Sequence, residues 1–316
     1  MTIVILDYAT LGYDLDLTPA EKFGKVVKYE NSTVEEASER VAEADVIIVN
    51  KIKMNEAVLK NAKNLKLICE TATGYDNIDL DYCRKHGILV SNTPAYSSQC
   101  VAQVTVSMVC SLATHLKEYR ECVASGKYTE AGVPNSLVPI YHELCGKTWG
   151  IIGYGNIGKA VGKIADAFGC KVIVNKRTPT PECECVSVDE LISRADIISI
   201  HCPLNENTKN LIDVRELSMM KKDAILVNVA RGGVWNEAAV ADAIINGEIG
   251  AMGCDVFTKE PFDTNHPFYK IKDFDNVLLT PHMAWGSFES RTRCYSTVIS
   301  NIEAYLKGEP TNIVNK

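Results

Sequence analysis

The chain has 316 residues, which is long enough for two domains with separate hydrophobic cores. Its 33 lysines and arginines against 40 aspartates and glutamates give a net charge of -7, which argues against nucleic acid or an anionic membrane as its main partner. Residues 1–8 carry no basic run or cleavage signal, and no stretch of about 18 apolar residues occurs, so we expect a soluble cytoplasmic protein.

The first 97 residues alternate short apolar runs with amphipathic stretches. TIVILDY, ADVIIVN, LKLICET and GILVSN predict buried strands, and TVEEASERVAEA and NIDLDYCRKHG predict helices between them. Such alternation predicts a parallel sheet that is covered by helices. A single long helix is expected over residues 97–126, and the polar segment 126–147 is interpreted as the loop of a domain junction.

A second series of strands and helices begins after this loop. Its predicted strands are KTWGIIG, KVIVNK, ADIISIHCP, DAILVNVA, GAMGCDV and NVLLTP. A helix over about residues 286–307 closes the chain and ends at Gly308. The fold class is therefore α/β with two doubly wound domains.

The twelve cysteines are scattered singly along both halves of the chain. The nearest two, Cys183 and Cys185, lack the two-residue spacer of zinc and redox pairs. We expect reduced thiols, and neither a disulfide nor a metal site.

A glycine motif follows the first strand of the second series, in WGIIGYGNIGKAVG. Gly153, Gly155 and Gly158 have the G-x-G-x-x-G spacing between a strand and a helix. The first glycine permits a tight turn, the second lets the backbone approach a pyrophosphate, and the third lets helix and strand pack closely. Since the helix N-terminus attracts the phosphates, the motif predicts a dinucleotide site.

The end of the next strand carries two cations where an NAD-specific fold has an acidic residue. Lys176 and Arg177 would attract the 2′-phosphate of NADP, and Thr178 would add a hydroxyl donor. We therefore expect NADP to be preferred and NAD to remain possible. The alternative is a solvated turn, with Glu182 reaching back to the ribose.

Polar residues follow three later strands of the same series. Arg231, Asp255 and His282 each come directly after an apolar run, and Glu260 lies in the loop beyond Asp255. Each alone fits a structural role, but the carboxyl ends of parallel strands meet at one edge, where ligands bind. Together they suit reduction of a 2-keto acid, with Arg231 gripping the carboxylate and His282, oriented by Glu260, donating the proton.

These motifs resemble the D-isomer-specific 2-hydroxyacid dehydrogenases over nearly the whole chain. The resemblance is carried by ATGYDNIDL, NTPAYSSQCVAQ, GKTWGIIGYGNIG, HCPLNENTKNLI, NVARGGVWNEAAV, DVFTKEP and LLTPHMAW. It implies that Arg231, Glu260 and His282 are catalytic, that Thr73 and Gly74 bind the substrate carboxylate, and that the protein is a homodimer. It also implies a discontinuous, flavodoxin-like substrate domain of residues 1–97 and 286–316, with the cofactor domain, residues 98–285, inserted. Further cofactor contacts are implied for Asn156, Ile157, His201, Pro203, Thr208, Val229 and Asp255.

Within the family, the chain is similar to the glycerate dehydrogenase or hydroxypyruvate reductase type. PAYSS followed by VAQ, and Trp285 three places after His282, suggest this type, with substrate contact and core packing as alternatives for Trp285. Other D-2-hydroxy acids, of the D-lactate or phosphoglycerate kind, remain alternatives. Formate dehydrogenases pair the histidine with glutamine, so Glu260 argues against them. A non-enzymatic, dinucleotide-sensing corepressor is the third alternative, although such proteins carry extended tails.

Overall fold

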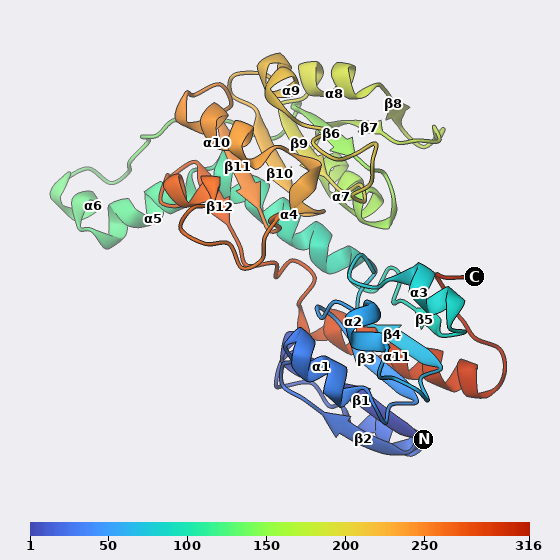
Figure 1. Ribbon diagram of the computed structural model, residues 1–316. Coiled ribbons are helices and arrows are strands. Elements are labelled where there is room, and N and C mark those ends of the chain that lie inside the picture. The colour runs from blue at the N-terminus through green and yellow to red at the C-terminus, as the bar shows by residue number, and fades with distance from the viewer. The chain divides into compact units, whose positions relative to one another are not determined.

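The computed structural model describes residues 1–316, and the chain divides into two compact units. The first unit consists of Met1–Ser97 and Gly286–Lys316, and the second of Ser98–Trp285 (Figure 1). The polar segment 126–147 lies inside the second unit, so the predicted domain junction there is wrong. The helix that precedes this segment packs on the second sheet, and the chain therefore changes units before that helix.

The first unit contains a five-stranded parallel sheet in the order β2-β1-β3-β4-β5. Its strands are β1 Thr2–Ile5, β2 Lys25–Lys28, β3 Val46–Val49, β4 Leu67–Glu70 and β5 Leu89–Ser91. The order is that of flavodoxin-like folds, as predicted. The edge strand β2 was not predicted, because its four residues are at least partly exposed and form no buried apolar run.

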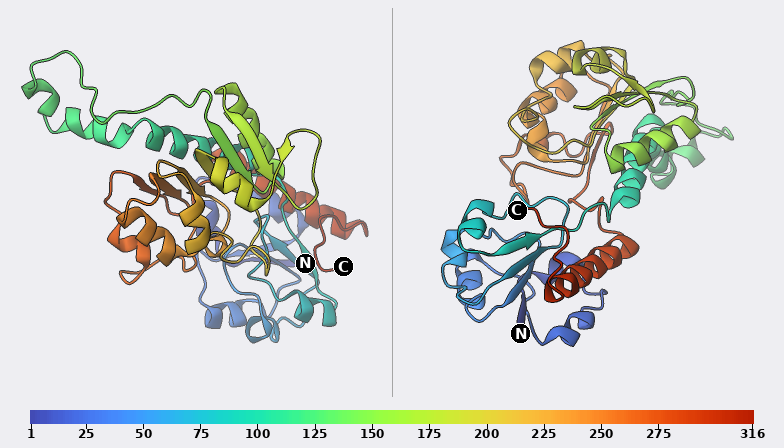
Figure 2. Two further views of the ribbon diagram at one scale, coloured as in Figure 1. Left: turned by 90° about the horizontal axis from the view of Figure 1, so that it is seen from above. Right: turned by 90° about the vertical axis from the view of Figure 1, so that its right-hand side faces the viewer.

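Helices cover both faces of this sheet (Figure 2, right). One face carries α1 Val34–Arg40, α2 Glu56–Leu59 and α3 Leu80–Lys85, and the other carries α11 Phe288–Leu306. Two 3-10 helices, Tyr8–Leu11 and Thr18–Phe23, follow β1. The closing helix α11 begins with the Ser287 side chain accepting a hydrogen bond from the Ser290 N–H, and Gly308 with φ 81° follows its end. The last segment of the chain thereby completes the first unit.

The second unit contains a seven-stranded parallel sheet in the order β12-β11-β10-β9-β6-β7-β8. Its strands are β6 Thr148–Ile152, β7 Lys171–Asn175, β8 Glu184–Cys185, β9 Ile197–Ile200, β10 Ile225–Asn228, β11 Ala251–Cys254 and β12 Val277–Leu279. The strand order reverses between β6 and β9, as in Rossmann folds, and ligands bind at such a reversal. The predicted fold class is confirmed.

Two helical layers bury this sheet (Figure 1). One hydrophobic cluster packs α4 Ser98–Ala113 and α7 Asn156–Ala167 on the sheet, and another packs α8 Val188–Arg194, α9 Val214–Met219 and α10 Glu237–Ile245. Two 3-10 helices, Gly232–Val234 and Pro267–Lys270, lie in the loops after β10 and β11. The loops at the carboxyl edge are thus mounted on a rigid, buried sheet.

The single helix predicted over residues 97–126 is broken in the structure. It consists of three helices: α4, which ends at Ala113, α5 Leu116–Ala124 and the short α6 Lys127–Glu130. His115 has φ 52°, a left-handed conformation that stops the helical hydrogen bonds, and the apolar pattern alone does not reveal it. No single helix is long and apolar enough to span a membrane; α4 and α5 pass that test only as a pair, bent by 62°.

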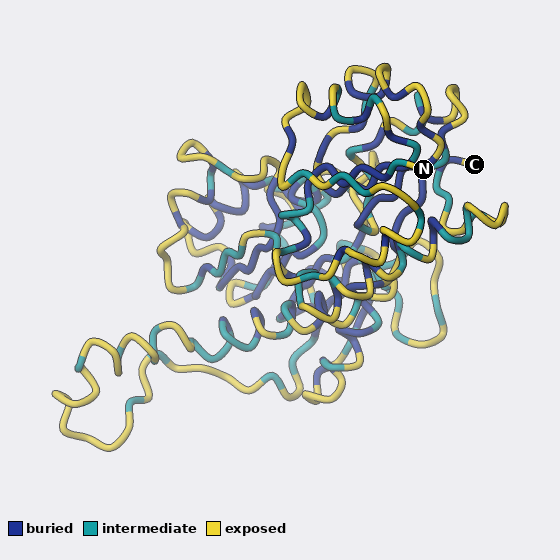
Figure 3. Tube along the Cα trace, turned by 90° about the horizontal axis from the view of Figure 1, so that it is seen from below, coloured by how far each residue is buried: buried dark blue, intermediate teal, exposed yellow.

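Helices α5 and α6 and the chain up to about residue 143 form an arm that extends from the second unit (Figures 1 and 2). Most of this arm is exposed (Figure 3). It carries apolar side chains in contact with solvent, including Leu137, Val138 and Ile140, which are 69%, 78% and 76% exposed. Exposed apolar side chains that cluster in this way are typical of an interaction surface.

Candidate active site

The glycine turn joins β6 to α7 at the reversal of the strand order. Gly153 has φ 92°, and a Cβ there would lie 2.5 Å from the backbone nitrogen of Cys202. A Cβ on Gly158 would lie 2.3 Å from the Gly153 carbonyl oxygen, whereas one on Gly155 would meet no atom within 4 Å. Two glycines are therefore required by packing, and the third leaves open space at the start of α7. This geometry fits a pyrophosphate beside the helix N-terminus.

The other residues that the resemblance assigns to the cofactor surround this turn. Asn156 and Ile157 open α7, Val229 follows β10, and a loop after β9 carries His201, Pro203 and Thr208. The Thr208 hydroxyl donates a 2.6 Å hydrogen bond to the Pro203 carbonyl and closes that loop. These residues therefore lie near the ends of the three strands at the reversal.

His201 has two buried ring nitrogens without a protein partner. Burial lowers the pKa of His201 to about 3, so the ring is neutral near pH 7. Buried polar atoms in native proteins almost always have partners. The unsatisfied ring at this edge therefore fits a residue that contacts a ligand.

The end of β7 presents the two adjacent cations. Lys176 is half-buried, Arg177 and Thr178 are exposed, and neither cation is paired with a carboxylate. Glu182, the alternative partner of the ribose, forms a 2.7 Å ion pair with Lys159 of α7. The hydrogen bond from Lys159 lowers the pKa of Glu182, which keeps this carboxylate charged and engaged. Lys176 also interacts electrostatically with Glu182, but neither Lys176 nor Arg177 forms an ion pair with it.

Arg231 lies in a tight turn that follows β10. Asn228, the last residue of the strand and fully buried, accepts a 3.0 Å hydrogen bond from the Ala230 N–H and donates one of 3.0 Å to the Arg231 carbonyl. A Cβ on Gly232 would lie 2.2 Å from the Phe257 carbonyl carbon, so the turn is in backbone contact with the next loop. The sequence analysis missed Asn228, although an asparagine that ends an apolar strand is a turn signal.

Asp255 follows β11 and supports the turn that carries His282. Its carboxylate is 1% exposed and accepts hydrogen bonds from the Thr280 hydroxyl at 2.5 Å and from the Met283 and Ala284 N–H groups at 2.9 Å. Burial raises the pKa of Asp255 against the opposing effect of these bonds. The structure therefore gives Asp255 a positioning role, and its contact with the cofactor stays a prediction.

His282 and Glu260 form a hydrogen-bonded pair across two loops. The distance between His282 Nδ1 and Glu260 Oε2 is 2.6 Å, and the other oxygen of Glu260 accepts a 2.9 Å bond from the Phe257 N–H. The two side chains are 22% and 30% exposed, so the pair lies at the surface of the second unit. With Nδ1 engaged, Nε2 of His282 is the ring nitrogen that can reach a substrate.

The remaining predicted substrate residues are Thr73, Gly74 and Trp285. Thr73 and Gly74 follow β4 at the carboxyl edge of the first sheet, where the Asn92 amide donates a 2.8 Å hydrogen bond to the Thr73 carbonyl. Trp285 is half-buried and packs against the hydrophobic cluster beneath α4 and α7. The packing alternative for Trp285 thus has a structural basis, and its contact with substrate stays a prediction.

Comparison with known proteins finds close relatives over the full length. The family described as "D-isomer specific 2-hydroxyacid dehydrogenase, NAD binding domain" matches residues 106–284. A hydroxypyruvate reductase of Blautia hydrogenotrophica is 35% identical over 327 aligned positions that cover 100% of both chains. A glyoxylate reductase of Thermococcus litoralis is 37% identical, with 88% of this chain and 86% of the relative covered. The solved structure of an Aquifex aeolicus D-lactate dehydrogenase, complexed with NAD and lactic acid, has a TM-score of 0.89 at 29% identity and covers 100% of this chain and 99% of its own.

The fold, the glycine turn and these similarities define an oxidoreductase that uses a nicotinamide dinucleotide and acts on a CH–OH group. Small 2-keto and 2-hydroxy acids are the substrates of this class. The chain belongs to the D-isomer specific 2-hydroxyacid dehydrogenase family, which confirms the resemblance drawn from its motifs.

Proposed function

We propose that this dehydrogenase reduces hydroxypyruvate or glyoxylate to the corresponding 2-hydroxy acid, with NADPH as the preferred cofactor. The His282–Glu260 hydrogen bond of 2.6 Å is the observation that carries the reductive chemistry, because it joins a proton donor to the anion that orients it. The names of the relatives from Blautia hydrogenotrophica and Thermococcus litoralis support the choice of substrate. Other D-2-hydroxy acids remain the second candidate.

Each catalytic side chain has a distinct task in this proposal. The Arg231 guanidinium grips the substrate carboxylate and polarises the neighbouring carbonyl, and the backbone at Thr73 and Gly74 binds the same carboxylate. His282 donates its Nε2 proton to the carbonyl oxygen, while the Glu260 carboxylate at Nδ1 favours the imidazolium and fixes the ring. A reduced nicotinamide bound beside the glycine turn would supply the hydride for the carbonyl carbon.

The preference for NADPH rests on the end of β7. Lys176 and Arg177 have no carboxylate partner, and no acidic residue stands directly after the strand to repel a phosphate. The 2′-phosphate of NADP carries about -1.5 to -2 charges near neutral pH, by analogy with other phosphate monoesters. Two unpaired cations at this position therefore favour NADPH over NADH.

The two units and the arm have separate roles in the proposal. The first unit acts as the substrate domain and the second as the cofactor domain. The arm, with exposed Leu137, Val138 and Ile140, serves as the surface through which two copies form a homodimer. Twelve cysteines without a disulfide suit the reducing conditions of the cytoplasm, which we propose as the location.

A panel of keto acids tests the proposed reaction. Glyoxylate, hydroxypyruvate, pyruvate, 2-ketobutyrate and a branched keto acid are each assayed with NADH and with NADPH. We expect the highest kcat/KM for hydroxypyruvate or glyoxylate with NADPH. A higher value for the branched acid contradicts the proposed substrate, and the absence of turnover with every acid contradicts enzymatic function and favours a dinucleotide sensor.

A further inference from the structure

The loop between β11 and β12 carries Glu260 on irregular backbone. The Glu260 carboxylate forms hydrogen bonds with the Phe257 N–H of the same loop and with His282 of the next loop. The position of the Glu260 carboxylate at His282 therefore depends on what holds this loop to the sheet.

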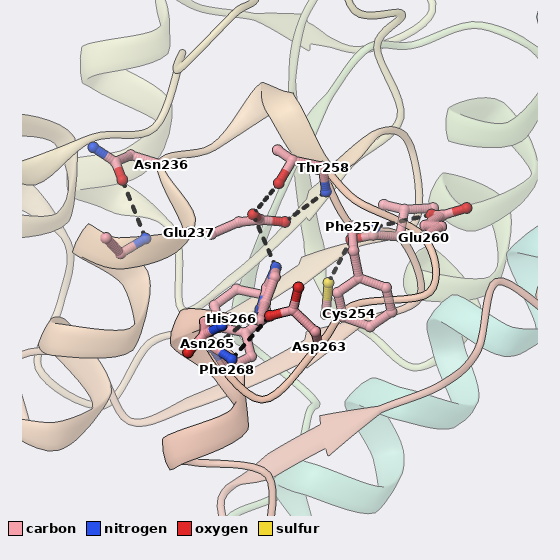
Figure 4. Close-up of polar contacts among 12 residues, drawn as sticks. Asn236, Glu237, Cys254, Phe257, Thr258, Glu260, Asp263, Asn265, His266 and Phe268 are labelled. Atoms are coloured by element: carbon pink, nitrogen blue, oxygen red, sulfur yellow. Dashed lines mark hydrogen bonds and ion pairs between the residues drawn. The ribbon is translucent and has the colours of Figure 1, made fainter. Parts of the chain in front are cut away.

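One buried carboxylate holds the loop at two points (Figure 4). Glu237, the first residue of α10, is 7% exposed. Its Oε1 accepts a 2.8 Å hydrogen bond from the Thr258 N–H, and its Oε2 accepts bonds from the Thr258 hydroxyl and, at 3.0 Å, from His266 Nε2. Residues 258 and 266 lie on either side of Glu260, so Glu237 ties down both sides of the segment that carries it.

The hydrogen bonds of His266 define which ring nitrogen carries the proton. Nδ1 accepts a 3.2 Å bond from the Phe268 N–H, so the proton lies on Nε2 and is donated to Glu237. The ring is 8% exposed and lies beside Phe262 and Phe257, at centroid distances of 4.8 and 5.8 Å. His266 thereby links Glu237 to the 3-10 helix Pro267–Lys270 of the same loop.

Neither a lysine nor an arginine pairs with the Glu237 carboxylate. Three donors from the loop, together with the N-terminal end of the α10 dipole, offset the cost of burying the carboxylate. An apolar side chain of similar volume at position 237 would stabilise the fold equally well, so stability alone does not require a carboxylate there. Directed bonds to both sides of the loop instead specify one loop conformation.

The same loop also contacts the turn of Arg231. A Cβ on Gly232 would lie 2.3 Å from the Thr258 nitrogen, so the backbone at Thr258 lies directly against the residue after Arg231. A loop held at Thr258 by Glu237 is thus fixed relative to Arg231 as well as to His282.

We propose that Glu237 and His266 are positioning residues, which hold the β11–β12 loop so that the Glu260 carboxylate stays on His282. They touch neither substrate nor cofactor in this proposal and act through Glu260. The inference rests on the proposed roles of Glu260 and His282. We call the Glu237–Thr258–His266 cluster the loop clamp.

Two amide substitutions separate the two hydrogen bonds of His266. His266→Asn keeps an acceptor for the Phe268 N–H but no longer reaches Glu237, whereas His266→Gln keeps a donor near Nε2 and loses the bond from Phe268. We expect His266→Asn to lower kcat about tenfold, since displacement of a catalytic group by about 1 Å costs up to 10²-fold. We expect His266→Gln to retain most of the parent kcat. Glu237→Gln, whose amide opposes the His266 donor, should resemble His266→Asn.

The pH profile distinguishes positioning from stability. In His266→Asn, reduction should fade at lower pH than in the parent, as in Glu260→Gln, because the anion that favours the imidazolium has moved away. Asp255 also interacts electrostatically with His282, and its hydrogen bonds to Thr280, Met283 and Ala284 do not involve the loop clamp. The shift is therefore attributable to Glu260.

A matched control removes a buried hydrogen bond elsewhere in the same unit. Ser199→Ala deletes the 2.9 Å bond from Trp149 Nε1 in the centre of the sheet. It should lower the Tm and leave the pH profile unchanged. Binding of NADPH, followed by quenching of tryptophan fluorescence, confirms that each variant is folded.

A double-mutant cycle decides the inference. If the loop clamp acts through Glu260, His266→Asn should cost little more in the Glu260→Gln background. Two results would overturn the inference while the role of Glu260 stands. One is a folded His266→Asn variant with the same pH profile as the parent enzyme. The other is a double variant whose loss in kcat equals the product of the losses in the two single variants. If Glu260→Gln itself leaves the pH profile unchanged, the proposed mechanism fails, and the loop clamp fails with it.

Discussion

Reversal of the charge at the end of β7 should invert the choice of cofactor. Lys176→Asp combined with Arg177→Ala places an anion where the 2′-phosphate of NADPH is proposed to lie, and such an anion suits the ribose hydroxyls of NADH. We expect kcat/KM with NADPH to fall and kcat/KM with NADH to stay the same or rise. Turnover at saturating cofactor should change little, because the change lies far along the cofactor from the reacting carbon.

The expected size follows from the exposure of the two side chains. A charge-assisted hydrogen bond is worth roughly 1.5 to 3 kcal/mol, but Lys176 is half-buried and Arg177 exposed, so solvent screening reduces each contact. One net contact of about 1.4 kcal/mol corresponds to about a tenfold preference for NADPH in the parent. Repulsion between the new aspartate and the phosphate adds to this loss, so the ratio of the two kcat/KM values should change by more than tenfold.

The assay measures kcat/KM for NADPH and NADH with one keto acid at low and high ionic strength. Lys171→Asp is the matched control, because Lys171 is exposed at the opposite end of the same strand, about 16 Å away at about 3.3 Å per residue. This distance exceeds the Debye length of about 8 Å at physiological ionic strength, so the control should not change the ratio. A parent enzyme with an equal or higher kcat/KM for NADH would refute the phosphate site.

Three other predictions concern catalysis and assembly. His282→Ala and Arg231→Ala should each nearly abolish reduction and leave cofactor binding largely intact. Loss of a general acid alone lowers the rate by about 10² to 10⁴. Near-normal turnover of His282→Ala at neutral pH would show that His282 is not the proton donor. Glu260→Gln should make reduction fade at lower pH than in the parent, and an unchanged pH–rate profile would exclude Glu260 from the mechanism. Val138→Glu with Ile140→Glu should convert a dimer into a monomer in analytical ultracentrifugation, because charges on an apolar interface oppose association. A dimer that survives both substitutions would place the interface away from the arm.

Most strands, and the polar residues that follow them at the carboxyl edge of the sheet, were predictable from the sequence. Each predicted strand is a short apolar run that is buried in a parallel sheet, and hydrophobic periodicity is a local property of the chain. Arg231, Asp255 and His282 were placed at one edge because parallel strands bring their carboxyl ends together. The exposed edge strand Lys25–Lys28 carries too little of this pattern to be recognised.

Local pattern did not predict breaks in the backbone. The apolar spacing of α4 continues past His115, and only the left-handed φ of 52° there divides the predicted helix. The junction predicted from composition at residues 126–147 was misplaced for a related reason, since such polar composition is also that of an exposed arm, whereas the family resemblance implied a boundary after residue 97. Composition reports exposure, whereas the division into units depends on which core each helix packs against.

The geometry of the site was decided by the tertiary structure. The hydrogen bond between Glu260 and His282 joins residues that are 22 positions apart, and the bond between Glu237 and His266 joins residues 29 positions apart. The sequence by itself determined which residues follow the buried strands, because the apolar runs that form those strands are a local property of the chain. Only the folded loops decided that Asp255 supports the His282 turn and that Glu237 holds the Glu260 loop, because directed hydrogen bonds between distant residues leave no periodic pattern in the chain.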